Sequence, residues 1–167
     1  MRTLSRVVAI VILAVTLTSP IALAQRQPVP PWREPLPPAR STAEIVVGET
    51  TVPVELAIAR DEQTLGLGYR NSLDPDAGML FVFEEASPRT FWMMGMRFCL
   101  DIIWVTGNEI VGAAESVCPP PAGTDASDYP SYPSDEPVTH VLEVNAGWLE
   151  AHGYGPGTPV EMPAGLK

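Results

Sequence analysis

A methionine-rich block is the first feature whose residue types suggest chemistry. Met93, Met94 and Met96 lie within the stretch Phe91–Met96. Thioether sulfurs are good Cu(I) ligands. Because neighbouring side chains of a strand point to opposite faces, only one of Met93 and Met94 can join Met96, and this requires a bulge at Gly95. The candidate site takes Met93 and Met96, with His140 or alternatively His152 as a third ligand. The alternative, which the residue types favour, is that these methionines fill gaps in an apolar core.

A second candidate is a set of polar residues near apolar strands. Asp101 lies within the run Leu100–Val105, and a buried carboxylate needs a partner. Arg70 is a reasonable partner, because guanidinium groups pair bidentately with carboxylates. Two interpretations stay open, a structural ion pair or capping network and a site that anchors a ligand. The predicted ligand-binding residues are Arg70, Trp92, Asp101, Tyr132, Glu143 and Asn145.

The segment 119–137 is a third candidate, with six prolines, four acidic residues and two tyrosines. Aromatic rings beside carboxylates suit stacking on sugars, and carboxylates suit Ca²⁺, although no EF-hand spacing is present. A loop of this length is usually functional or disordered. We expect it to fold over the strand that carries Asp101 and to form a cleft. A solvated irregular loop is the alternative.

Sequence signatures of enzymes are absent. The chain contains no GxSxG, HExxH, P-loop or dinucleotide-binding motif. The main hypothesis is therefore a non-enzymatic binding or accessory domain with no cofactor. The alternatives are a periplasmic protein that handles Cu(I) through methionines and a hydrolase whose site is assembled in space.

The first 24 residues have the order of a secretory signal. Two arginines precede an apolar run at 7–17, and Ala22-Leu23-Ala24 is a cleavage site. A membrane anchor is the alternative, but a spanning helix needs roughly 20 apolar residues. We expect cleavage after Ala24, a periplasmic or secreted location, and no stable membrane insertion after cleavage.

The charge balance limits the partners. Ten basic residues stand against 20 acidic ones, a formal net charge of −10. Such a chain repels nucleic acid backbones. The expected partners are a small molecule, a glycan or an envelope protein.

Cys99 and Cys118 are the two cysteines of the chain. Two strand-like segments, Leu100–Val105 and Glu109–Val117, flank a Gly107-Asn108 turn signal. Folding that hairpin brings the cysteines together. In the oxidising compartment that an exported protein reaches, we expect them to form a disulfide. Two free buried thiols are the alternative.

The organisation follows from proline and apolar patterning. Residues 25–42 are proline-rich and predict a disordered tether, and residues 43–167 predict one β-rich domain. Near-continuous apolar runs such as Met79–Phe83 predict central strands. Helical patterns occur over 61–70 and 145–153. The expected fold is an antiparallel β-sandwich or distorted barrel with one or two short helices.

The chain resembles a bacterial and archaeal family known as domain of unknown function 192, over about residues 52–162. The resemblance is carried by the segments Glu62–Leu73, Gly78–Phe83, Phe91–Met96, Leu100–Val105 and Val141–Gly147. The family pattern usually has lysine where Met94 stands and often proline at Cys99. The resemblance implies a compact, mostly-β fold, often exported, with no established activity.

Overall fold

The computed structural model describes residues 41–166. The predicted signal peptide, 1–24, and all but the last two residues of the predicted tether, 25–42, lie outside the described residues. No helix among the described residues is long and apolar enough to cross a membrane.

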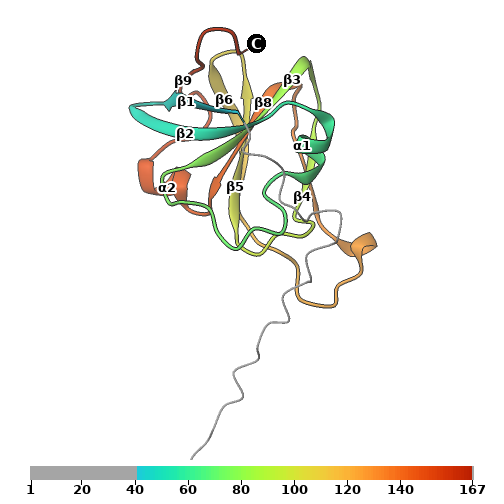
Figure 1. Ribbon diagram of the computed structural model, residues 1–167. Helices are drawn as coiled ribbons and strands as arrows, with labels where there is room; N and C mark the ends of the chain where they lie inside the picture. The colour runs from blue at the N-terminus through green and yellow to red at the C-terminus, as the bar shows by residue number, and fades with distance from the viewer. Residues whose placement is uncertain (1–40, 167) are drawn as a thin grey trace, which may run out of the picture.

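The fold is one mostly-β domain built on a curled seven-stranded sheet, which confirms the predicted class (Figure 1). The strand order is β6-β5-β8-β3-β2-β1-β9. Neighbouring strands are antiparallel except β2 and β3, which are parallel. The strands are β1 (Thr42–Val47), β2 (Thr50–Ala57), β3 (Gly78–Ser87), β5 (Leu100–Thr106), β6 (Glu109–Val117), β8 (Val138–Asn145) and β9 (Val160–Glu161).

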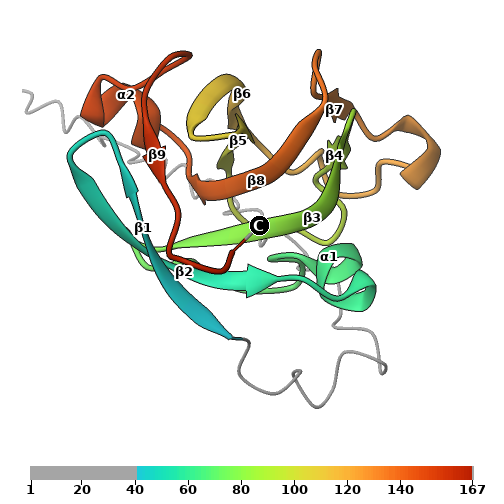
Figure 2. The same cartoon turned by 90° about the horizontal axis from the view of Figure 1, so that it is seen from above.

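The two ends of this sheet approach each other, which gives a half-barrel (Figure 2). Ile110 of β6 donates its N–H to the carbonyl of Thr158 at 2.9 Å, just before β9. Two further strands, β4 (Thr90–Trp92) and β7 (Ser131–Pro133), pair with each other as a small second sheet. The 119–137 segment contributes β7 and, before it, a short 3₁₀ helix, η2 (Ala126–Asp128).

The side chains of β3 explain its continuous apolar run. Leu80 and Val82 join one core cluster, while Met79 and Phe81 join a second cluster on the opposite face of the sheet. Both faces of the strand are covered, as the sequence predicts. Strand alternation therefore fixes which buried residues can meet, because a residue of one cluster cannot touch the other through the sheet.

Helix α1 is shorter than the sequence predicts. It covers Arg60–Leu65 instead of extending to Arg70, and it begins after Ala59 rather than at Asp61. The Glu62 carboxylate accepts the N–H groups of Ile58 and Ala59, each at 2.9 Å. Gly66 ends the helix with a φ of 48°, which is a conformation that glycine adopts readily. The second helix, α2, covers Trp148–His152.

The predicted hairpin and disulfide are confirmed. β5 and β6 pair from Thr106↔Glu109 at the turn to Leu100↔Val117 at the open end. Gly107 takes a φ of 60° in that turn. The sulfurs of Cys99 and Cys118 are bonded, and their Cα atoms are 4.1 Å apart.

Candidate functional site

Arg70 pairs with Glu55 and not with Asp101, so the predicted partnership is wrong. The guanidinium donates Nη2–H to Glu55 Oε2 at 2.7 Å and Nη1–H to Oε1. The hydrogen bond to Glu55 raises the pKa of Arg70 against the opposing effect of burial, and the charges of Glu55 and Glu143 raise it further. Arg70 can reach this partner because the chain leaves the helix at Gly66 and turns back beside β2.

Glu143 joins Arg70 in one polar cluster. It lies on β8 with 5% of its surface exposed. Cross-strand register places Glu55, Met79 and Glu143 opposite one another on β2, β3 and β8. Glu55 forms the ion pair with Arg70, and the charge of Glu143 acts on the same guanidinium. This arrangement stabilises the approach of the 66–71 segment to the strands, and it leaves Arg70 with its charge already balanced.

Asp101 lies on the other face of the sheet and is fully buried. Its Oδ1 accepts the N–H groups of Ser116 at 2.8 Å and Gly147 at 3.1 Å, and its Oδ2 accepts that of Leu149 at 3.0 Å. These bonds join β6 to the start of α2. Asp101 therefore has the structural capping role that the sequence left open, and it does not meet Arg70.

Asn145 has a similar bridging contact at the end of β8. Its side-chain amide donates to the carbonyl of Asp74 at 3.0 Å, which ties the turn before β3 to β8. Of the six predicted ligand-binding residues, Arg70 and Glu143 are linked by their charges. Asp101 lies apart, and Trp92 and Tyr132 belong to the small sheet.

Trp92 lines a groove between α1 and β4, and 51% of its surface is exposed. We call this space of about 540 Å³ the arginine groove. Its walls combine aromatic rings with two arginines and polar groups of α1. Its lining includes Arg60, Gln63, Phe83, Arg89, Phe91 and Trp92. An adjoining hollow of about 780 Å³ shares Arg60, Gln63, Phe83 and Arg89 with it.

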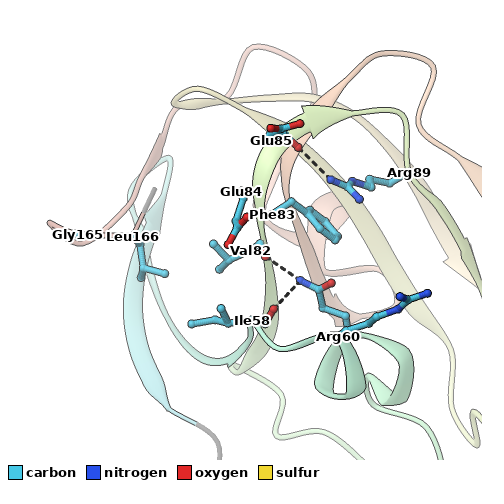
Figure 3. Close-up of a pocket in the computed structure, with 10 residues that line it drawn as sticks. Ile58, Arg60, Val82, Phe83, Glu84, Glu85, Arg89, Gly165 and Leu166 are labelled. Carbon is cyan, nitrogen blue, oxygen red and sulfur yellow. Dashed lines mark hydrogen bonds between the residues drawn. The ribbon is translucent and has the colours of Figure 1, made fainter.

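Arg89 is held in place on an aromatic surface. Its guanidinium carbon lies 3.8 Å from the centre of the Phe83 ring, and its Nη2 donates to the carbonyl of Glu85 at 2.9 Å (Figure 3). Its buried Nε finds no hydrogen-bond partner within residues 41–166. Figure 3 shows Arg60, from α1, on the same side of β3 as Arg89.

Gln63 fixes the helical wall of this groove. Its side-chain amide donates to the carbonyl of Val82 at 2.8 Å and to that of Ile58 at 3.1 Å. The helix is therefore joined to β3 by a side chain that cannot move without breaking these bonds. The groove is a preformed feature with a fixed helical wall.

Tyr132 lines a second hollow, of about 480 Å³, which we call the edge cleft. Tyr132 pairs with Phe91 across the small sheet and packs against the second core cluster. The last third of the 119–137 segment does fold into a cleft wall, as expected. The strand it faces is β6, with Trp104 of β5, and not the part of β5 that carries Asp101.

The predicted copper ligands do not gather at one place. Met93 is buried in the second core cluster, and Met96 packs against that cluster. His140 alternates with Val141 along β8 and points to the same face as Leu142, which belongs to the other cluster. His140 thus lies on the opposite face of the sheet from the cluster that contains Met93, and Cu(I) binding stays a prediction.

His140 has an environment that should respond to pH. It is 4% exposed, and its Nδ1 lies 3.0 Å from the Thr139 hydroxyl. Burial lowers the pKa of His140 from its ordinary value of 6.5. The unfolded chain therefore binds a proton at a pH where the folded domain does not, so stability should fall as pH drops from 6.5 toward the lowered pKa.

We expect His140→Gln to reduce the loss of unfolding free energy between pH 7.5 and pH 5.5. Urea unfolding at the two pH values measures that loss, and the exposed His152 provides the control variant His152→Gln. An equal acid-induced loss in wild type and His140→Gln would show that other groups cause the pH dependence.

The sequence matches the model of a known protein family. The model of the family described as uncharacterized ACR, DUF192, matches residues 27–162. The chain belongs to the DUF192 family. This confirms the resemblance. No curated protein matches the chain.

Two solved structures share the DUF192 fold of this chain. One is a protein of Sinorhizobium meliloti 1021 described as a "putative transcription regulator", with 30% identity and a TM-score of 0.65, over 74% of this chain and 95% of the other. The second is a protein of unknown function from Novosphingobium aromaticivorans DSM 12444, with 29% identity and a TM-score of 0.66. That match covers 74% of this chain and 86% of the other.

Sequence reasoning missed Arg60 and Arg89. They come from α1 and from the turn after β3, and each alone has the pattern of a solvated charge. The one sequence signal that could have pointed to them is the small number of basic residues in the domain. The stretch 41–166 contains four basic residues, all arginines, and two of them line one groove.

Proposed function

We propose that this DUF192 protein is an exported, non-enzymatic binding domain whose arginine groove takes a small ligand with a ring and an anionic group. Export is supported by the signal-like order of residues 1–24 and by the disulfide, because such bonds persist in oxidising compartments. An acidic saccharide is the ligand class that combines a ring for Trp92 with a carboxylate for the arginines.

One observation carries the proposal. Arg60 and Arg89 form no ion pair with any described residue, and both line the groove that contains the exposed ring of Trp92. Arg70, by contrast, has its charge balanced by Glu55. Guanidinium groups without a carboxylate partner beside an aromatic surface suit an incoming carboxylate and the ring attached to it.

Nucleic acid is a poor candidate for this groove. The Sinorhizobium relative is described as a "putative transcription regulator", but the present chain has a net charge of −10. Two arginines cannot offset the repulsion between that charge and a phosphate backbone. The proposed ligand is therefore a single small anion.

Calorimetric titration with D-glucuronate, and with D-glucose as its neutral counterpart, tests the proposal. We expect glucuronate to bind and glucose to bind far more weakly. Arg89→Gln and Trp92→Ala should each weaken glucuronate binding by about tenfold, the worth of one charge-assisted hydrogen bond or stacked ring.

The matched control is Arg97→Gln, which removes the same charge from a residue outside the lining of the groove. It should leave the affinity within about twofold of wild type. The proposal is wrong if glucuronate does not bind, or if Arg97→Gln weakens binding as much as Arg89→Gln.

A further inference from the structure

The strand β6 has an outer edge that is only partly covered. β6 is the terminal strand of the sheet on the side of β5. At its start, Ile110 donates to Thr158 O at 2.9 Å and accepts from Gly157 N at 2.8 Å. Beyond Val111, no other described segment pairs with this edge. The position of a neighbouring strand is thus occupied beside Ile110 and open from Gly112 onward.

The edge cleft lies along this open part. One wall comes from Leu149 of α2 with Gly155 and Pro156, and the other comes from residues 131–136. Figure 2 shows β6 between α2 and β7. Ala113 packs toward the first core cluster and Ala114 toward the second, yet both line the cleft. The cleft therefore opens onto the strand edge itself, between the two faces of the sheet.

The residues of this edge leave the backbone accessible. Gly112, Ala113 and Ala114 follow one another, and none carries a side chain longer than a methyl group. In an antiparallel edge strand, alternate residues direct their N–H and C=O groups outward. An extended segment lying in the cleft can therefore form main-chain hydrogen bonds with β6.

The charge of the cleft indicates the kind of segment that fits. Glu115, Asp135 and Glu136 line it and are exposed, and no lysine, arginine or histidine is among its lining residues. A basic segment is attracted to these walls. A second copy of β6 would bring another Glu115 to the same edge, and like charges there disfavour self-pairing.

We propose that the edge cleft binds an extended, lysine- or arginine-bearing segment of a partner protein, which adds to β6 as a further strand. Strand addition draws affinity from the main chain and specificity from alternate side chains. This surface is separate from the arginine groove, because the linings share no residue and their charges are opposite.

The probe is a fluorescent heptapeptide of alternating lysine and valine, measured by anisotropy with the complete mature domain. The comparison peptides replace each lysine with aspartate, or carry N-methyl groups on alternate amides of the lysine peptide. We expect the lysine peptide to bind. The aspartate peptide should not bind, and N-methylation should weaken binding by about tenfold or more, since it removes several main-chain donors.

A charge variant and a matched control locate the site. Glu115→Gln, Asp135→Asn and Glu136→Gln together should weaken binding of the lysine peptide by about tenfold at low salt. The control removes three exposed acids elsewhere, with Glu44→Gln, Asp74→Asn and Asp76→Asn, and should have a much smaller effect.

Three results would overturn this proposal. They are no binding of the lysine peptide, equal weakening by the two triple variants, and full binding of the N-methylated peptide. A dimer that forms through β6 in sedimentation, and that the lysine peptide does not dissociate, would also overturn it. Glucuronate binding tests the arginine groove and not the edge cleft. The ligand proposal and the strand-addition proposal can therefore be disproved independently.

Discussion

Replacing Asp101 with alanine should lower the free energy of unfolding by about 4 kcal/mol. The fully buried carboxylate accepts three backbone N–H groups, from Ser116, Gly147 and Leu149. Alanine leaves these donors without their acceptor, and the bond of Leu149 is buried while those of Ser116 and Gly147 are partly buried. Each unsatisfied buried donor costs about 1–3 kcal/mol, so the loss is large even when a water molecule enters the space.

Urea unfolding of Asp101→Ala, Asp101→Asn and Asp74→Ala measures this effect. Asparagine keeps one oxygen for Ser116 and Gly147, which both bond to Oδ1, but places an amide group toward the N–H of Leu149. Its loss should be intermediate. Asp74 is exposed, so Asp74→Ala should stay within about 0.5 kcal/mol of wild type. A loss below about 1 kcal/mol for Asp101→Ala would contradict the capping role.

The same variant separates structure from binding. Asp101 has no exposed surface, so a ligand cannot touch it in the folded domain. At a temperature where Asp101→Ala is still folded, glucuronate should bind to it as to wild type. Asp101 was a reasonable ligand candidate from sequence alone. A carboxylate in an apolar strand indicates a specific hydrogen-bond partner, but the sequence does not identify whether that partner is the protein backbone or a ligand.

Local features were predictable from the sequence. The Gly107-Asn108 turn sets the β5–β6 register, and that register brings Cys99 to Cys118. The apolar run of β3 predicted a strand covered on both faces, as Phe81 and Leu80 show. In each case the information lies within about 20 neighbouring residues, so period and turn chemistry are sufficient.

Contacts between distant segments were not predictable in the same way. The partner of Arg70 depends on which face of the sheet each strand presents. Asp101 and Glu55 are both acids in strands, and only the register across β2, β3, β8 and β5 puts them on opposite faces. The premature end of α1 at Gly66 then aims Arg70 at Glu55.

The candidate sites show this limit most clearly. The arginine groove takes residues from α1, from the turn after β3 and from β4, and the edge cleft joins β6 to residues 131–136. Neither has a linear motif. The sequence named Trp92 and Tyr132 as ligand-binding candidates, and that role stays a prediction. The structure places them on two different hollows. Tyr132 is opposite Phe91, so Trp92, the next residue of β4, points to the other face of the small sheet.

Removing the disulfide should have the second large effect on stability. The double variant Cys99→Ser, Cys118→Ser avoids a free thiol and should lose about 3 kcal/mol of unfolding free energy. The sequence separation of 19 residues sets the loop that the bond closes. In the loop-entropy model, opening it returns conformational freedom to the unfolded chain, and a loss of this size lowers Tm by roughly 10 °C.

Thermal unfolding with and without a reductant measures the effect. Reductant should lower the Tm of wild type toward that of the double variant and should leave the variant unchanged. The bond closes the hairpin whose Ser116 N–H binds Asp101, and the carbonyl of Cys99 accepts the N–H of Ala146 at 3.2 Å. Native contacts in this corner therefore survive without the bond, and the main change is in the unfolded chain. If reductant shifts the double variant as much as wild type, the shift does not come from this disulfide. If it shifts neither, the β5–β6 ladder alone holds the corner and the entropic argument fails.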